Sequence, residues 1–137
     1  MRATRCRPLP SIGRVTVPAE PADLASQITL HGDSAQLVTV NPAGRPHVVA
    51  VLVAQAGDEL NVPAGTKTRA NVLANPSVTL LFGPPQGGEY TLVVDGDAVV
   101  SPGETLTIRP SSALLHRVAH ATGDGPRCFA VEVPATG

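Results

Sequence analysis

The chain has 137 residues, the size of one domain, and 42% of them are hydrophobic, which is too many for a disordered protein. Only 15% are charged, which is low for a monomer's surface, so we expect a second copy of the chain to cover part of it. The chain has one Tyr, two Phe and no Trp. It therefore lacks the stacking platforms of single-stranded nucleic-acid proteins, and no run approaches the roughly 20 apolar residues of a membrane span.

Charge is unevenly distributed along the chain. The first 14 residues hold four arginines and no acid, whereas the rest holds 6 Lys and Arg against 11 Asp and Glu. An acidic body argues against general nucleic-acid binding. The basic segment lacks the apolar run of a secretory signal, and Pro8 and Pro10 oppose a transit-peptide helix. We expect residues 1–19 to be a flexible leader, dispensable for folding over 1–14, before one domain over 20–137.

The two cysteines lie at opposite ends of the chain. Cys6 falls in the expected leader and Cys128 near the C-terminus, and no Cys-x-x-Cys pair is present. This spacing predicts neither a disulfide framework nor a structural zinc site. It favours a reducing compartment, the cytoplasm.

The sequence of the first half of the domain predicts one helix and three strands. Pro21 suits the first turn of a helix over 20–28, and Gly32 suits the stop after it. β-rich segments follow at 35–40, 47–53 and 60–62, separated by turn residues, and are expected to form a meander. The second segment is apolar on both faces, which predicts a central or barrel strand rather than an edge strand.

The second half begins with a helix over 66–74. Thr66 is its expected N-cap, and Asn75-Pro76 ends it. The residues expected to face inward are Ala70, Val72 and Leu73. Five strands follow, with a hairpin turn at 95–97 between the second and third: 77–82, 90–94, 98–100, 105–109 and 129–133. Six or more short strands with one inserted helix predict a mainly β fold, a small barrel with few short helices, rather than a parallel sheet.

The segment 65–71 is the most informative for chemistry. Lys67 is the only lysine of the chain, Arg69 follows two residues later, and threonines flank Lys67. All lie at a helix start, where free N–H groups and the helix dipole attract anions, so a phosphate is the natural ligand. The alternative is a solvated helix start with a capping threonine.

Two segments resemble the pyridoxamine 5′-phosphate oxidase-like family of flavin-binding split barrels. The first is Asn-Pro-Ala-Gly-Arg-Pro-His-Val-Val over 41–49, and the second is Gly-Thr-Lys-Thr-Arg-Ala-Asn over 65–71, continuing through Asn-Pro-Ser-Val to residue 80. Val-Asp-Gly-Asp-Ala over 94–98 is similar to a later strand of the family. The order and spacing of these pieces carry the resemblance, which spans about residues 30–100.

The resemblance implies a six-stranded split barrel, a homodimer, and FMN or the deazaflavin F420 bound between subunits. Lys67 and Arg69 would hold the cofactor phosphate, Thr66 and Thr68 would hydrogen-bond it, and Asn71 would brace the site. The residues expected along the flavin ring are His47, Val48, Val49 and Ala50.

The implied function is an oxidoreductase that transfers hydride to or from a small molecule. Many family members carry an arginine in the second strand that reaches the flavin phosphate, and the segment 48–53 has none. The alternative is therefore a non-catalytic cofactor-binding or structural barrel dimer. No nucleic acid or membrane is expected as a partner.

A second candidate segment holds His116, Arg117 and His120. If it is helical, the two histidines share one face, but two imidazoles leave a zinc site without its remaining ligands, so no metal is expected. In a flavin site, Arg117 would reach an anionic substrate and His116 would donate a proton.

Overall fold

The computed structural model describes residues 6–8, 23–122 and 125–134. Most of the expected leader, together with residues 20–22 of the first expected helix, lies outside these ranges. In the described part of the chain no helix is long and apolar enough to cross a bilayer.

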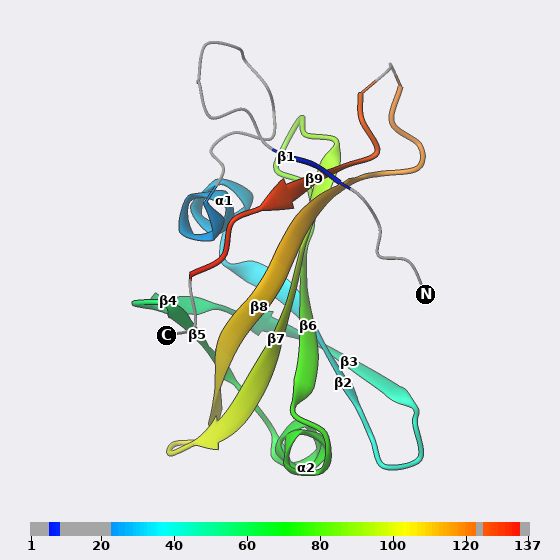
Figure 1. Cartoon of the computed structure of the whole chain (residues 1–137). Coiled ribbons are helices and arrows are strands. Elements are labelled where there is room, and N and C mark those ends of the chain that lie inside the picture. The colour runs from blue at the N-terminus through cyan, green and yellow to red at the C-terminus, as the bar shows by residue number, and fades with distance from the viewer. Residues whose placement is uncertain (1–5, 9–22, 123–124, 135–137) are drawn as a thin grey trace.

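The strands form one strongly curled sheet, antiparallel except for the parallel pair of β1 and β9, as expected for a split barrel (Figure 1). Its order is β1-β9-β8-β7-β6-β2-β3, with β5 added beside the first half of β8 and β4 beside β5. The strands are β1 Arg7–Pro8, β2 Ser34–Val40, β3 Pro46–Leu52, β4 Ala54–Ala56, β5 Glu59–Pro63, β6 Ser77–Phe82, β7 Tyr90–Ser101, β8 Thr105–Arg117 and β9 Cys128–Val131. The structure thus has more strands than the six expected.

The core fills the concave side of the sheet. Alternate residues of the longer strands face inward, so buried and more exposed positions alternate along β2, β6 and most of β7. The most completely buried aliphatic and aromatic side chains are Leu37, Leu80, Phe82, Leu92, Leu106 and Leu115. Helix α1 (Leu24–His31) and helix α2 (Thr66–Ala74) lie at opposite ends of the molecule (Figure 1).

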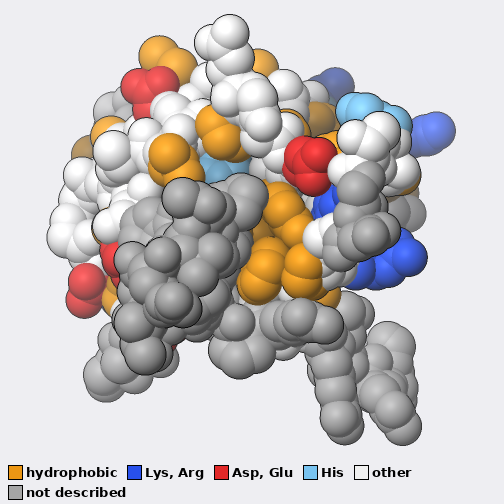
Figure 2. All heavy atoms as spheres, turned by 90° about the horizontal axis from the view of Figure 1, so that it is seen from above, with side chains coloured by type: hydrophobic (Ala, Val, Ile, Leu, Met, Phe, Trp, Pro, Cys, Tyr) orange, Lys and Arg blue, Asp and Glu red, His pale blue; other side chains and the backbone are white. Residues whose placement is uncertain are grey.

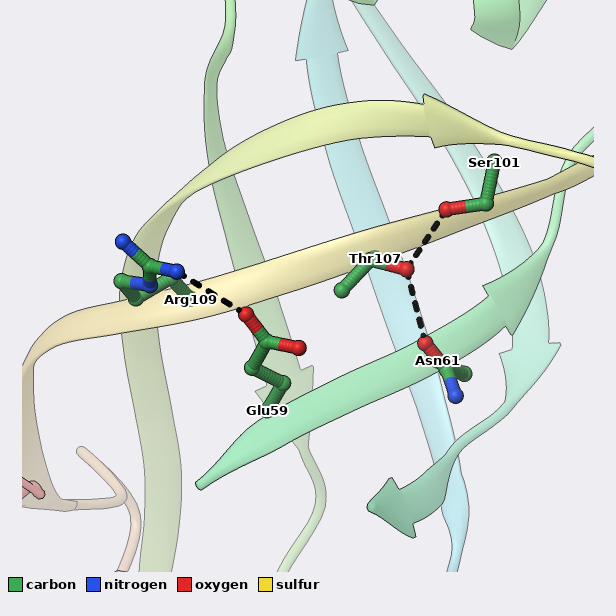
Figure 3. Close-up of polar contacts among 5 residues, drawn as sticks. All are labelled: Glu59, Asn61, Ser101, Thr107 and Arg109. Carbon is green, nitrogen blue, oxygen red and sulfur yellow. Dashed lines mark hydrogen bonds and ion pairs between the residues drawn. The ribbon is translucent and has the colours of Figure 1, made fainter. Parts of the chain in front are cut away.

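A polar ladder on the outside of the sheet fixes the register of β5 against β8 (Figure 3). Thr107 Oγ1 donates to Asn61 Oδ1 at 3.0 Å and shares a 2.6 Å hydrogen bond with Ser101 Oγ. Beside it, Arg109 pairs with Glu59 at 3.1 Å. Because β5 leads directly into the connection before α2, this ladder also positions the start of that helix.

Helix α1 begins later than predicted because Asp23 caps it. The Asp23 carboxylate accepts a 3.0 Å hydrogen bond from the Ser26 N–H, and Gly32, with φ of 95°, ends the helix as expected. The hydrogen bond from the Ser26 backbone holds the pKa of Asp23 below its usual value.

We expect Asp23→Ala to lower the free energy of unfolding by about 0.5–2 kcal/mol at pH 7, because the cap is lost. Asp23→Asn keeps a capping oxygen and should lose much less. The Asp23 contribution is complete above the unfolded-state pKa of about 3.9 and disappears as the pH falls through the lower folded pKa. Urea denaturation between pH 2.5 and pH 7 measures this, and equal stabilities of Asp23→Ala and wild type at pH 7 would contradict it.

The hairpin turn predicted at 95–97 is wrong. β7 runs through these residues without a break, and the register shift lies between Asp95 and Gly96, opposite the extra residue Ser111 of β8. A Cβ on Gly96 would lie 2.5 Å from the Arg109 carbonyl oxygen, so this glycine permits close backbone approach. The bulge also accommodates Pro110 inside a long strand.

Helix α2 has its predicted bounds but a different orientation. Its buried residues are Thr68, Asn71 and Val72, so Val72 faces inward as predicted. The prediction is wrong for Leu73, which is 77% exposed, and for Ala70, which is exposed as well. Asn71 Nδ2 donates to Thr39 Oγ1 of β2 at 3.1 Å. This buried polar pair, rather than an apolar stripe, sets the orientation of the helix.

β3 is an edge strand, contrary to the prediction of a central one. It pairs along its length only with β2, and β5, the third strand of the predicted meander, pairs with β4 and β8 instead. Val48 and Leu52 point to the outside and are 54% and 63% exposed, while Val51 is buried. The apolar pattern on both faces therefore leaves exposed apolar surface in one chain.

The two cysteines form a disulfide, which contradicts the expectation of reduced thiols. Cys6 bonds to Cys128 across 122 residues, and the adjoining β1 pairs in parallel with β9. Sequence spacing gave no hint of this bond because the first segment returns to the last strand. The argument for a reducing compartment no longer holds.

Candidate functional site

The sheet does not close between β3 and β5, and a pocket lies in this gap. We call it the split pocket. Its volume of about 480 Å³ is within the range of small-molecule sites. The pocket is lined by β3, the end of β5, the start of α2 and the β7–β8 turn, through residues His47, Val49, Ala50, Val51, Pro63, Ala64, Gly65, Thr66, Lys67, Thr68 and Glu104.

The start of α2 forms one wall of the split pocket. The N-cap is Gly65 rather than the predicted Thr66, and no side chain caps the helix. The first intrahelical bond runs from the Arg69 N–H to the Gly65 carbonyl, so the amides of residues 66–68 precede it. A Cβ at Gly65 would meet no atom within 4 Å, so the backbone here is open to an approaching ligand.

The two side chains predicted to bind the phosphate differ in their position relative to the split pocket. Lys67 is exposed and lines the split pocket. Arg69 folds back over the first turn, where its Nε donates to the Gly65 carbonyl at 3.3 Å and its Nη2 to Thr66 Oγ1 at 3.4 Å. Arg69 is not a lining residue, so its charge acts on the pocket from behind the helix start.

β3 forms the opposite wall. Because its residues alternate between faces, His47 and Val49 face the pocket, whereas Val48 faces outward. The Nδ1 atom of His47 is buried and has no hydrogen-bond partner within the described residues. A buried nitrogen without a partner is costly, and a ligand in the pocket would supply one.

Asn71 lies behind the site rather than in it. Its hydrogen bond to Thr39 connects α2 to β2, and Thr39 is the cross-strand neighbour of His47. This contact joins α2 to β2, the strand beside the β3 wall, and the bracing of a bound cofactor by Asn71 stays a prediction.

His116 and Arg117 lie far from the split pocket within one chain. They end β8, at the opposite end of the molecule from α2 (Figure 1). Arg117 lies 3.5 Å from Glu89 and donates to the Thr122 carbonyl at 2.7 Å. Lys and Arg side chains gather on one side of this end (Figure 2). A single chain does not bring these residues to the predicted cofactor site.

The pairing of His116 and His120 on one helix face does not occur. His116 lies in β8 and His120 in the turn after it. Across the described ranges no group of three or more His, Cys, Asp or Glu is placed to hold a metal ion.

Sequence reasoning missed four residues of the split pocket. Val51, Pro63 and Ala64 are apolar wall residues next to predicted ones. Glu104 is the unexpected member, since it comes from a turn almost 40 residues after Lys67. No local pattern in the sequence connects that turn to the start of α2.

Comparison with known proteins gives the same architecture. A family model described as pyridoxamine 5′-phosphate oxidase matches residues 25–127, most of the chain. No curated protein matches the sequence.

Solved structures share the fold at low identity. An F420 reductase is 23% identical, with 61% of this chain and 91% of that one covered and a TM-score of 0.51. A FAD-binding protein of Mesorhizobium loti is 16% identical, with coverages of 65% and 87% and a TM-score of 0.55. A Clostridium acetobutylicum protein of the pyridoxinephosphate oxidase family is 11% identical, with coverages of 68% and 85% and a TM-score of 0.56.

Proposed function

This chain belongs to the pyridoxamine 5′-phosphate oxidase family, and on that premise we propose that the split pocket binds the phosphate end of FMN or F420. The observation that supports this most is the uncapped start of α2, where three amides and Lys67 border one cavity. Free helix-start amides and a nearby cation form an anion site. The F420 reductase and the FAD-binding protein with the same fold are consistent with such a ligand.

The side chains around the pocket suit such a cofactor. Thr66, Lys67 and Thr68 would hold the phosphate, with the buried Thr68 fixing the helix start against the barrel. His47 would donate or accept a hydrogen bond through Nδ1, the nitrogen that has no partner among the described residues. When bound, the flavin or deazaflavin supplies hydride transfer to or from a small molecule.

A second copy of the chain completes the site in this proposal. On the outer face of the sheet, Val38 of β2 pairs with Val48 of β3, and a second aliphatic row runs across β6, β7 and β8. Exposed and half-exposed apolar side chains that gather on one face favour association with another protein surface. The side chains are Val38, Val48, Leu52, Leu81, Val93 and Leu114.

We expect the protein to sediment as a dimer at micromolar concentration, and Val48→Glu to shift it towards monomer. The reason is the desolvation cost of a carboxylate placed in an apolar interface. Leu30→Glu on α1 is the matched control, because Leu30 is also exposed, at 46%, but lies outside this face. A wild-type monomer at that concentration would contradict the proposal.

A non-catalytic barrel dimer is the second candidate. The absence of an arginine in 48–53 favours it, because β3 then offers no cation to the phosphate. The phosphate is left to Lys67 and the amides at the start of α2. The two candidates differ in whether the bound cofactor turns over. In an enzyme, a donor reduces the cofactor or the reduced cofactor passes hydride to an acceptor. In a binding protein, neither reaction takes place.

The test is optical. The purified protein is titrated with FMN and with F420, and the absorption bands near 450 nm and near 420 nm report binding and reduction. Saturable binding of either supports the proposal, and turnover with a hydride donor separates the enzyme from the binding protein. If neither cofactor binds at millimolar concentration, the cofactor-binding proposal is contradicted and a structural barrel remains as the function.

A further inference from the structure

Glu104 is a charged residue of the split pocket that the proposed function does not use. It lies in the turn between β7 and β8, and it lines the same cavity as Lys67. Its φ of 58° makes it the one non-glycine residue with positive φ among those described. A side chain other than Asn or Asp is uncommon in this conformation, and such residues cluster at ligand sites.

The position of Glu104 is fixed by its own backbone. Its carbonyl accepts a 2.9 Å hydrogen bond from the Ala64 N–H, next to the N-cap of α2. Thr105 Oγ1 closes the turn by donating to the Pro102 carbonyl at 2.9 Å. The turn itself would be served as well by glycine at 104, so its geometry does not explain a glutamate.

The pocket therefore carries both signs of charge. Its ionisable lining residues are His47, Lys67 and Glu104. In the described part of the chain neither Lys67 nor Glu104 forms an ion pair; the ion pairs present are Arg109–Glu59 and Arg117–Glu89. Lys67 is thus left for an anion, while the carboxylate disfavours a second anion nearby.

We infer that Glu104 is a specificity-determining residue that accepts hydrogen bonds from neutral hydroxyl groups of the bound cofactor and repels any further anionic group. The inference rests on the proposed function of the split pocket. FMN carries one terminal phosphate and a polyhydroxyl chain, whereas the phosphate of F420 continues into a tail of carboxylates. Glu104 therefore favours FMN over F420.

The experiment compares FMN and F420 affinities of wild type and Glu104→Gln, which keeps the size and removes the charge. We expect Glu104→Gln to raise the affinity for F420 relative to FMN by roughly three- to tenfold at low salt, and by less at 1 M salt. Glu132→Gln is the matched control, because it removes an exposed carboxylate beyond the end of β9 and should leave the ratio unchanged.

The outcomes separate the two proposals. If wild type binds a cofactor and Glu104→Gln leaves the FMN-to-F420 ratio unchanged, Glu104 does not determine specificity but the split pocket still binds its ligand. If wild type binds neither FMN nor F420, the proposed function falls and this inference falls with it. A ratio that changes equally in Glu132→Gln would also overturn the inference, since the effect would then come from net charge alone.

Discussion

Lys67→Ala is expected to weaken FMN binding about ten- to 150-fold while leaving the fold intact. The loss of one charge-assisted contact to a phosphate costs about 1.5–3 kcal/mol, and each 1.4 kcal/mol is a factor of ten. Lys67 is exposed and forms no ion pair among the described residues, so its removal should scarcely change the melting temperature. Titration and melting curves of both proteins measure the two effects.

Two further variants sharpen this test. Arg69→Ala should weaken FMN binding less than Lys67→Ala, because Arg69 contacts its own helix turn and does not line the pocket. Arg127→Ala removes an equal charge near β9, at the other end of the molecule, and should have the smallest effect. Equal losses in all three variants would indicate a general charge effect and remove Lys67 from the site.

Cys6→Ser is expected to lower the free energy of unfolding by about 2–4 kcal/mol. The disulfide to Cys128 closes a loop of almost the whole chain, and long loops lose the most unfolded-state entropy when they are closed. Wild type in the presence of a thiol reductant should show the same loss. Denaturation in urea with and without reductant measures both.

The matched comparison is the double variant Cys6→Ser/Cys128→Ser. It should lose about as much as the less stable single variant, because either change alone already removes the bond. Wild type that is equally stable with and without reductant would contradict a structural role for this disulfide. It would also support the sequence-based expectation that residues 1–14 are dispensable for folding.

Local signals were sufficient for the elements whose ends are chemically marked. Helix α2 and strand β6 have their predicted bounds, since Gly65 precedes the helix and Asn75-Pro76 separates the two. The mainly β barrel class is confirmed for the same reason: short apolar segments between turn residues form strands whatever their partners. The family resemblance is confirmed as well by the match over 25–127.

Contacts between segments distant in the sequence could not be predicted from local signals. The Asp-Gly-Asp sequence at 95–97 has turn chemistry, yet β7 continues through it opposite a bulge at Ser111 of β8. Leu73 suggested an inward face, but the buried pair of Asn71 and Thr39 rotates α2 the other way. The position of Glu104 beside α2 depends on the hydrogen bond to Ala64, which no single segment reveals.

The candidate site was predicted in part. The resemblance named His47, Val49 and Lys67, which the sheet and α2 bring to one cavity. It also named Val48, which faces the other side of β3. Arg117, which came from the second candidate segment, lies at the other end of the molecule. A sequence pattern marks residues that belong together in a family, whereas the register of each strand decides which of them share a face.

Amide NMR spectra recorded during an FMN titration report directly on whether the start of α2 binds the phosphate. We expect the backbone amides of Thr66, Lys67 and Thr68 to shift the most and to saturate together, because they precede the first intrahelical bond of α2. The amide of Arg127, at the other end of the molecule, should stay in place. Saturable FMN binding that leaves those three amides unshifted would show that the phosphate binds elsewhere.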